Sequence, residues 1–184
     1  MDHYLDIKIV PDEEVPVYFI RNKIYTKLHK ALFSLNSTDI GVSFPNYKIK
    51  LGNVIRLHSS ENSLSKLQNE NWLGGLTGYC AVSEIQPIPD IVSYRTISRK
   101  QANMTAAKLR RLIKRGSITA AEANQYKAKM FANGFDDPYL ELESTSNGNK
   151  HRRYIVFGEL TQKRDAGSFD QFGLSKEAMI PWFI

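Results

Sequence analysis

The chain has 184 residues, 42% of them hydrophobic, which is enough to bury the core of one domain or of two small ones. Its formal net charge is +6, and its single cysteine, Cys80, excludes a disulfide framework and a zinc site built from cysteines. No apolar run is long enough for a transmembrane helix, and the first residues do not have the pattern of a signal peptide. We therefore expect a cytoplasmic protein that does not associate with membranes.

The first half of the chain predicts strands and helices in alternation. Alternating apolar residues predict a strand over 4–10. Apolar residues at helical spacing predict a helix over about 17–35, with His29 at the edge of its buried stripe. Similar patterns predict strands over 40–44, 51–59 and 76–85 and a short helix over about 61–72. This βαββαβ order is typical of a ferredoxin-like sandwich, which is a fold of the α+β class.

Two prolines within 86–90 predict a linker, which divides the chain into domains 1–90 and 91–184. In the second domain we expect a mixed α/β module with a packed C-terminal strand. Its further predicted elements are helices over 105–115 and 119–132 and strands over 139–144 and 153–158. Gly116 is placed to end the first of these helices in a left-handed conformation, and a capping box at Thr119 starts the second.

Positive charge concentrates in the segment 93–115, which holds eight of the 25 lysine and arginine residues. Outside this segment the chain has 17 basic and 19 acidic residues, and no acid occurs from 91 to 121. The helix predicted here has two sides, with Lys108, Arg110, Arg111, Lys114 and Arg115 on one and Leu109, Leu112 and Ile113 on the other. Because acids are missing, ion pairs within the helix do not explain the charge, and we expect a surface that binds nucleic acid.

The candidate chemistry begins from the four histidines, His3, His29, His58 and His151, whose spacing matches no common metal motif. A Walker phosphate loop, a GxSxG elbow and a strong RNP1 match are also missing from the sequence. RNA cleavage needs none of these motifs, because RNA supplies its own nucleophile, the ribose 2′-hydroxyl. The protein needs a group that titrates near neutral pH, for which histidine is suited. Taken alone, His29 and Ser144 are more often structural residues.

Several sequence pieces, taken in order, resemble one known family. They are MDHYLDIKIVPDEE at the start, then KLHKAL, IGVSFP, SRKQAN, LRRLIKR, the serine loop 144–148, and the ending FGLSK and PWF. Together they make the chain similar, from end to end, to the CRISPR repeat-processing endoribonuclease of subtype I-F. The resemblance implies a ferredoxin-like domain that carries the catalytic histidine and a second domain with an arginine-rich helix. It also implies a metal-independent cut at the 3′ base of a repeat RNA hairpin, through the 2′-hydroxyl.

The same resemblance implies the partners of the protein. The family needs no cofactor and stays on the crRNA product after the cut. It serves there as a subunit of the type I-F effector complex, beside the backbone subunits of that complex. We expect the protein to be monomeric before it joins the complex.

The resemblance carries over residue by residue. His29 falls on the catalytic histidine, and Ser144 on the serine that holds the nucleotide whose 2′-hydroxyl attacks. Ser146 matches a second loop serine near the scissile phosphate. Arg99 and Gln101 match a pair that contacts base edges in the stem, as bidentate Arg–guanine and Gln–adenine pairing would allow. The residues expected along the major groove are Arg110, Arg111, Lys114 and Arg115, with Lys108 on the same side of the helix.

Two positions depart from the family pattern. Phe172 stands where some members have a tyrosine of the catalytic site, so another group must orient His29 or the cut is slow. His151 stands where some members stack a phenylalanine on the base near the cut, and a histidine can also stack.

Two other functions stay open. One is an RNA-binding subunit with weak cleavage, as the missing hydroxyl at Phe172 would allow. The other is a DNA-binding helix-turn-helix built from 105–115 and 119–132. That function is disfavoured because the basic helix comes first, whereas a recognition helix comes second.

Overall fold

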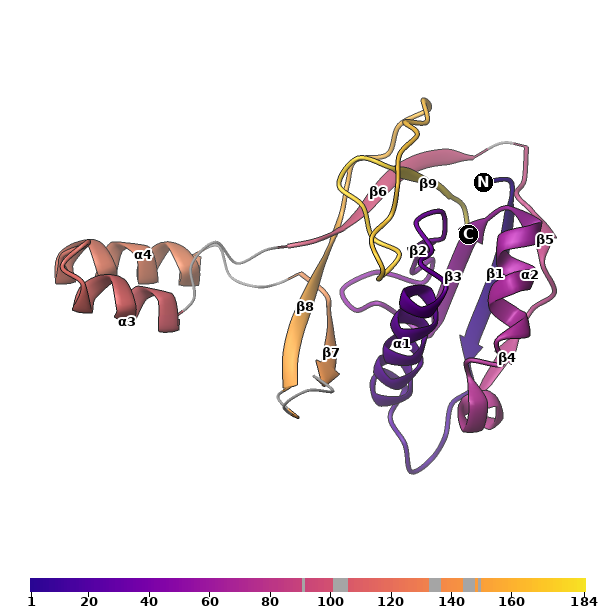
Figure 1. The fold of residues 1–184 in the computed structure, drawn as a ribbon, viewed down its shortest axis with the longest axis horizontal. Coiled ribbons are helices and arrows are strands. Elements are labelled where there is room, and N and C mark those ends of the chain that lie inside the picture. Colours follow the sequence, from indigo (N-terminus) through magenta and orange to yellow (C-terminus); the bar gives the residue numbers. More distant parts are fainter. Residues whose placement is uncertain (91, 101–105, 133–136, 144–147, 149) are drawn as a thin grey trace.

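The computed structural model describes residues 1–90, 92–100, 106–132, 137–143, 148 and 150–184, without the side chains of 106–108 and 127–132 (Figure 1). Within these residues, no helix is both long enough and apolar enough to cross a membrane.

The first half of the chain forms an antiparallel sheet with the strand order β2-β3-β1-β4. Its strands are β1 (His3–Ile9), β2 (Gly41–Ser43), β3 (Val54–Ser59) and β4 (Cys80–Val82). The register pairs Leu5 with Leu57 and Ile7 with Ile55, and all four side chains are buried. The alternation of apolar residues in β1 therefore sets which face of the sheet meets the core.

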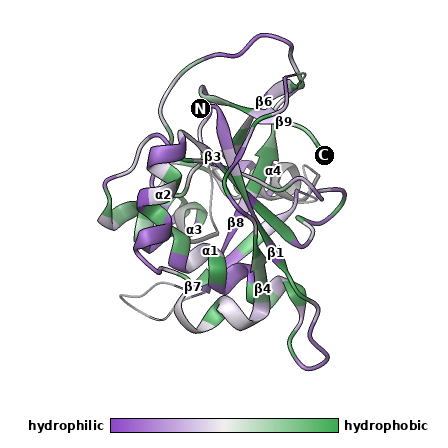
Figure 2. Cartoon of the chain, turned by 90° about the vertical axis from the view of Figure 1, so that its right-hand side faces the viewer, coloured by the Kyte–Doolittle hydropathy of each residue, from purple (hydrophilic) through white to green (hydrophobic). Residues whose placement is uncertain are grey.

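Two helices cover this sheet (Figure 1). The long helix α1 (Val17–Ser34) buries Ile20, Ile24 and Leu28, as the helical spacing predicts, together with Tyr25 and Leu32. The short helix α2 (Glu61–Asn69) starts at Ser60, whose side chain accepts a hydrogen bond from the Ser63 backbone N–H. In Figure 2, α2 carries both hydrophilic and hydrophobic residues, as expected for a helix with one buried side. The predicted βαββαβ order is confirmed, with the strand order of a ferredoxin-like sandwich.

The second half forms another antiparallel sheet and a pair of helices. The sheet has the strand order β7-β8-β6-β9. Its strands are β6 (Ser93–Arg99), β7 (Tyr139–Glu143), β8 (Lys150–Phe157) and β9 (Met179–Trp182). The helices α3 (Ala106–Lys114) and α4 (Ala120–Ala132) pack on each other and stand away from both sheets (Figure 1).

The buried residues of both sheets belong to one hydrophobic cluster, which includes Ile7 and Leu57 of the first sheet and Ile97, Leu140 and Ile155 of the second. Helix α1 packs against β7, so the cluster continues from one half to the other. This continuity fixes how the two halves are placed, and the division into domains at residue 90 stays a prediction.

Two sequence-based predictions need correction. Residues 76–79 do not form a strand but belong to the 3-10 helix η1 (Gly74–Tyr79), and the strand starts only at Cys80. The three glycines of this segment favour a tight turn, and Gly74 adopts a φ of +51°. The predicted linker also contains a short strand, β5 (Gln86–Pro87), which pairs with β1 at the edge of the first sheet. Proline is tolerated there because an edge strand leaves some of its N–H groups unpaired.

The predicted ends of the two outer helices are confirmed. Gly116 follows α3 with a φ of +69°, the left-handed conformation expected there. The Thr119 backbone N–H donates to Glu122 at 2.7 Å, and the Glu122 N–H donates to the Thr119 hydroxyl at 3.2 Å. This reciprocal pair is a capping box, and it fixes where α4 begins.

Candidate active site and nucleic-acid interface

His29 lies on the side of α1 that is only partly buried, between the buried residues Leu28 and Leu32 of the same helix. Its Nδ1 atom lies 2.9 Å from the backbone carbonyl oxygen of Gln171. A carbonyl oxygen can only accept, so Nδ1 carries a proton and donates it to this bond. In the neutral ring Nε2 is then unprotonated, and it can accept a proton from a substrate.

The Phe172 ring stacks on the imidazole of His29, with 3.6 Å between the ring centroids and 10° between the planes. Its backbone is held on both sides. The Phe172 N–H donates to the Asp170 carboxylate at 2.8 Å, and the Tyr25 hydroxyl donates to the Phe172 carbonyl at 2.7 Å. Tyr25 is fully buried in α1, and burial raises the pKa of its hydroxyl, which stays a donor. Phe172 is thus fixed to the same helix that carries His29.

The next residue, Gly173, brings this segment against β2. Its carbonyl accepts a hydrogen bond from the Val42 N–H at 2.8 Å, and its φ is +70°. A Cβ atom on Gly173 would lie 2.3 Å from the Val42 side chain, so only glycine allows this approach. The glycine therefore lets Gln171 and Phe172 reach His29.

Arg153 of β8 lies on the other face of Phe172. The guanidinium carbon is 3.4 Å from the ring centroid, and since the imidazole lies over the same centroid, the two groups must occupy opposite faces. Arg153 is only 6% exposed, and its Nε has no hydrogen-bond partner among the described residues. Burial lowers the pKa of Arg153, while Tyr25 and Asp170 act in the opposite direction. The result is a stack of imidazole, phenyl ring and guanidinium, with a cation–π contact on its inner side.

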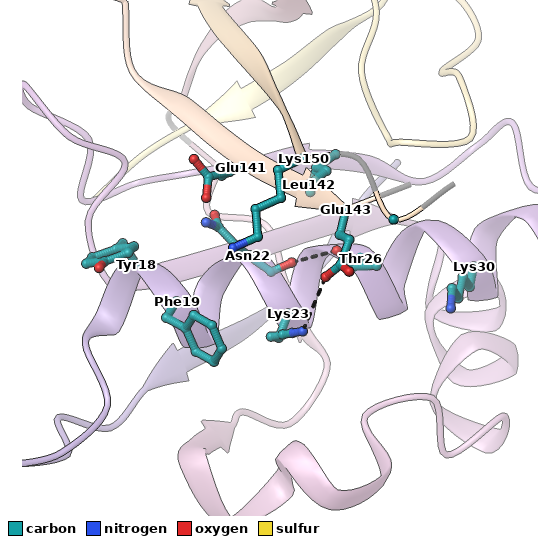
Figure 3. Close-up of a pocket in the computed structure, with 11 residues that line it drawn as sticks. Tyr18, Phe19, Asn22, Lys23, Thr26, Lys30, Glu141, Leu142, Glu143 and Lys150 are labelled. Carbon is teal, nitrogen blue, oxygen red and sulfur yellow. Dashed lines mark hydrogen bonds and ion pairs between the residues drawn. The ribbon is translucent and has the colours of Figure 1, made fainter. Parts of the chain in front are cut away.

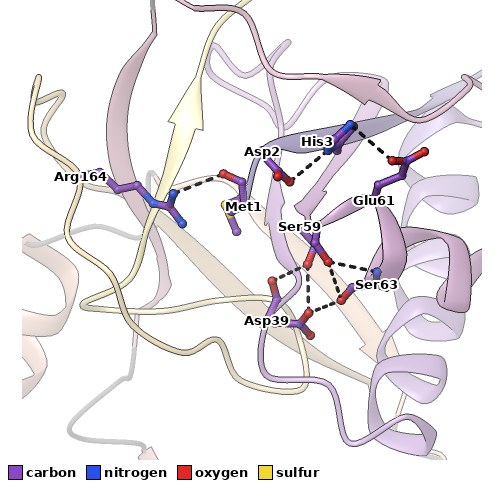
Figure 4. Close-up of polar contacts among 9 residues, drawn as sticks. Met1, Asp2, His3, Asp39, Ser59, Glu61, Ser63 and Arg164 are labelled. Carbon is purple, nitrogen blue, oxygen red and sulfur yellow. Dashed lines mark hydrogen bonds and ion pairs between the residues drawn. The ribbon is translucent and has the colours of Figure 1, made fainter.

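The other histidines have different surroundings. His58 is fully buried, and burial lowers its pKa to about 3, so it stays neutral beside the Ser43 hydroxyl at 2.8 Å. His3 lies beside the carboxylates of Asp2 at 3.0 Å and Glu61 at 3.9 Å (Figure 4). His151 is exposed on β8, in register with Leu142 of β7.

Of the predicted site residues on the β7–β8 side, Ser144 and Ser146 lie outside the described residues. The strands that end on either side of them, at Glu143 and Lys150, are paired, and Glu143 is 4.0 Å from Lys23 of α1. The strand β7, which ends at Glu143, therefore packs against the helix that carries His29.

Five of the cations predicted to bind RNA are described, on α3, directly after it and at the end of β6. The side chains of Arg99, Arg110, Arg111, Lys114 and Arg115 are all exposed. Among the described residues, none of the five has an acidic group within 4.0 Å. Gln101 lies outside the described residues, as does the side chain of Lys108. These exposed cations can contact phosphates without first breaking an ion pair.

The apolar side of α3 is narrower than its sequence predicts. Leu109 is buried and Leu112 is half-buried, but Ile113 is 40% exposed. Because α3 packs on α4, a single neighbouring helix covers only part of its apolar side.

Sequence reasoning missed two groups of the His29 site. The Gln171 carbonyl is a backbone atom and leaves no signal in the sequence. Arg153 did leave a signal in the sequence. Side chains alternate along a strand, so a strand that buries Ile155 also places residue 153 on its buried face. Among the described residues, no group of three or more His, Cys, Asp or Glu side chains could hold a metal ion.

Comparison with known proteins identifies similar chains. Residues 4–183 match the model of a family described as CRISPR-associated protein (Cas_Csy4). Two curated relatives, from Escherichia coli (strain UTI89 / UPEC) and Pseudomonas aeruginosa (strain UCBPP-PA14), are named CRISPR-associated endonuclease Cas6/Csy4. Each is 36% identical to this chain, and each match covers 100% of both proteins. A solved structure of the CRISPR endoribonuclease Cse3 bound to 19 nt RNA matches 99% of this chain and 100% of its own, at 14% identity and a TM-score of 0.42.

Proposed function

Since the chain belongs to the Csy4 family of CRISPR-associated endonucleases, we propose that it cuts CRISPR repeat RNA at the 3′ base of a hairpin, with His29 as the catalytic histidine. The observation that carries this role is the bond from Nδ1 of His29 to the Gln171 carbonyl, at 2.9 Å. It leaves Nε2 as the atom that accepts a proton from the ribose 2′-hydroxyl.

The proposed reaction moves one proton and exchanges one bond to phosphorus. Nε2 of His29 takes the proton of the 2′-hydroxyl, and the 2′-oxygen attacks the adjacent phosphorus. The bond from phosphorus to the 5′-oxygen breaks, and the proton that His29 accepted is passed on to that oxygen as it leaves, so the imidazole is neutral again. The products are a 2′,3′-cyclic phosphate and a 5′-hydroxyl, which accounts for every atom without water or a metal ion.

The remaining site residues have positioning roles in this proposal. Ser144 holds the ribose whose hydroxyl attacks, Ser146 contacts the scissile phosphate, and His151 stacks on the base near the cut. The exposed position of His151 on β8 supports its role, since a stacking residue must be reachable by RNA.

RNA binding is assigned mainly to the second half of the chain. Arg110, Arg111, Lys114 and Arg115, with Lys108, contact the phosphates along the major groove, while Arg99 and Gln101 contact base edges in the stem. Their support is the exposure of the described arginines and Lys114 on one helix and one strand end. In this proposal residues 1–90 supply the catalytic histidine, and residues 91–184 bind the hairpin and supply the groups that position His29 and the RNA at the cut.

After cleavage the protein stays on the crRNA and becomes a subunit of the type I-F effector complex. Before that step it is a monomer. A tight complex with the product is expected because the binding surface lies on α3 and β6, whereas the bond that breaks lies beside α1. The cut does not remove the contacts that hold the hairpin.

The deciding experiment uses the repeat RNA encoded beside the gene, in buffer containing EDTA. We expect cleavage of this RNA, no cleavage of the same RNA with a 2′-deoxyribose at the cut, and equal binding of both. Cleavage that requires Mg²⁺, or that survives the 2′-deoxy substitution, would contradict the mechanism.

An RNA-binding subunit with weak cleavage is the second candidate, because Phe172 lacks the hydroxyl of the family tyrosine. The structure favours cleavage over this candidate, since the Gln171 carbonyl supplies a hydrogen bond to the imidazole. Tight binding of the wild-type protein to its own repeat without any cut would favour the subunit.

A further inference from the structure

A groove runs along α1, between this helix and β7. It consists of two adjoining cavities of about 360 and 400 Å³, which share Tyr18, Asn22 and Glu141 as lining residues. Figure 3 shows the first cavity, with side chains of α1 on one side and those of β7 and β8 on the other. We propose that this groove binds single-stranded RNA, namely the nucleotides that follow the cut on its 3′ side. The inference rests on the proposed function.

The groove leads away from His29. An α-helix turns by about 100° per residue, so, seen down the axis of α1, the side chains of Tyr18 and Asn22 project within about 20° of the direction of the His29 side chain. The first cavity extends to Lys30, the residue next to His29, and to Gly148 of the β7–β8 hairpin. Along the axis, Tyr18 lies about 16 Å from His29. A strand that leaves the cleavage site along this side of α1 therefore enters the groove without a turn.

Aromatic rings line the groove at its far end. Tyr18 is 60% exposed and Phe19 47% exposed on α1, and Tyr139 of β7 lines the second cavity together with Tyr18. Large exposed aromatic rings are uncommon on a solvated helix, whereas they are the stacking surfaces on which proteins hold single-stranded bases.

The charges of the groove fit the phosphates of such a strand. Five basic residues line the two cavities: Arg21, which is buried, Lys23, which pairs with Glu143, and the exposed Lys30, Lys50 and Lys150. The three lining acids are each close to a base: Asp137 to Lys100 at 2.5 Å, Glu141 to Arg152 at 3.8 Å and Glu143 to Lys23 at 4.0 Å. Lys30 lies next to His29 in α1, at the end of the groove where the strand enters, and the Lys150 side chain reaches toward Asn22 (Figure 3).

Asn22 adds an observation that does not depend on shape or charge. Its side-chain amide oxygen is buried and has no hydrogen-bond partner among the described residues, and Asn22 lines both cavities. A buried acceptor without a donor is costly, and a ligand that supplies the donor removes the cost. A ribose 2′-hydroxyl or an exocyclic amino group of a base is such a donor.

The chemistry also indicates which flank of the hairpin is bound. The scissile phosphate lies at the 3′ base of the stem, beside His29, so the strand that continues past it is the 3′ flank. The 5′ flank leaves from the opposite strand of the stem. A groove of about 16 Å accommodates on the order of three to five nucleotides, given a rise of about 3.4 Å per stacked nucleotide.

The test measures binding of a hairpin that carries a 2′-deoxyribose at the cut, alone and with five nucleotides added on the 3′ or the 5′ side. We expect the 3′ flank to tighten binding about 10-fold and the 5′ flank to have no effect. An abasic 3′ flank should lose most of this gain, because its phosphates remain but nothing stacks on Tyr18.

Variants then locate the effect. Tyr18→Ala and Asn22→Ala should reduce the gain from the 3′ flank to about 2-fold or less, whereas Tyr18→Phe, which keeps the ring, should retain it. Phe33→Ala is the matched control, since Phe33 is an aromatic residue of α1 that is 59% exposed and lines neither cavity. It should leave the gain unchanged.

The inference is overturned if the hairpin with the 3′ flank and the bare hairpin bind with equal affinity. It is also overturned if Tyr18→Ala and Asn22→Ala keep the increase in affinity from the 3′ flank, or if the 5′ flank produces the same increase. In those cases the bare hairpin still binds, and the hairpin with the 3′ flank and a ribose at the cut is still cleaved, if the proposed function is correct. Failure of the bare hairpin to bind, or of that flanked ribose hairpin to be cleaved, would instead overturn the proposed function, and the groove with it.

Discussion

The His29 site and the basic helix α3 are built in opposite ways. His29 stacks on Phe172, which is held by fully buried Tyr25 and backed by buried Arg153. On α3 the described basic side chains are exposed, and the buried residues of α3 and α4 among those described are Leu109 and Ala123. Proton transfer needs a fixed geometry, whereas phosphate binding needs accessible charge on a surface that can adapt. Changes in the first region should therefore alter the cleavage rate, and changes in the second should alter the affinity.

The largest expected effect separates rate from affinity in the first region. His29→Ala should lower the single-turnover cleavage rate by at least ~10²–10⁴-fold, because the proton acceptor is lost. Binding of an uncleavable hairpin should be unchanged. His3→Ala serves as the control, since His3 is also a histidine beside oxygen acceptors, the carboxylates of Asp2 and Glu61, but lies on β1 away from the proposed cleavage site. An unchanged rate in His29→Ala would sink the assignment.

The converse change removes charge from α3. Replacing Arg110, Arg111 and Arg115 by alanine should weaken hairpin binding on the order of 10²-fold and lower the salt slope by about 1 for each lost phosphate contact. With protein in excess over its weakened Kd, the cleavage rate should stay near that of the wild type. Lys66→Ala on α2 is the control for a lost surface charge. Wild-type affinity in the triple variant would show that α3 does not bind the hairpin.

Arg99 and Gln101 separate sequence-specific binding from phosphate binding, because changes at either residue should lower the affinity only for the cognate hairpin. Alanine at either position should cost about 1–3 kcal/mol of binding free energy on the cognate hairpin and relax the preference at one base pair. The measurement is a set of hairpins with each stem pair exchanged in turn. An equal loss on every hairpin would make the two residues phosphate contacts.

Arg153 tests whether a buried charge can act on the rate through Phe172. Arg153→Met removes the cation behind the ring, and we expect about 10-fold slower cleavage with unchanged binding. Arg153→Lys, which keeps a cation, should recover part of the rate. In a His29→Ala background Arg153→Met should have no further effect on cleavage. A loss of affinity instead would place Arg153 in contact with the RNA.

Phe172→Tyr should produce the smallest change. While the two rings stay stacked, the added hydroxyl lies in the plane of the residue 172 ring and does not point at an imidazole nitrogen, so the rate should stay near that of the wild type. Comparison of thermal midpoints with the wild type checks that the stack is intact. A large fall in rate would mean that the site is built around the phenyl ring and does not accept the family tyrosine.

The sequence alone was sufficient for elements whose signals are local. The spacing of Ile20, Ile24 and Leu28 predicted α1, and Gly116 with the capping box at Thr119 predicted where α3 ends and α4 begins. It was insufficient at 76–79, where a strand was predicted but the residues belong to a 3-10 helix that begins earlier, at Gly74. Gly74, with a φ of +51°, lies outside the predicted strand, so the pattern within 76–85 did not include the residue that starts the turn.

The His29 site shows the same limit in tertiary structure. The family resemblance left two outcomes for the missing hydroxyl at 172, namely that another group orients His29 or that the cut is slow. The orienting group itself could not be inferred, because it is the backbone carbonyl of Gln171, 142 residues away, and backbone atoms are the same in every residue. The roles of Ser144, Ser146 and Gln101 remain predictions that the described residues do not test.

The separation between His29 and Gln171 also matters while the protein is being made. A nascent chain that has been synthesised through α4 already contains His29 and the basic residues of α3, but neither Gln171 nor Phe172. At about 5–20 residues per second, the remaining segment takes several seconds to follow. During that interval the ribosome-bound fragment has the cations to hold RNA without the groups that orient its imidazole, so binding competence should precede cleavage competence on the ribosome.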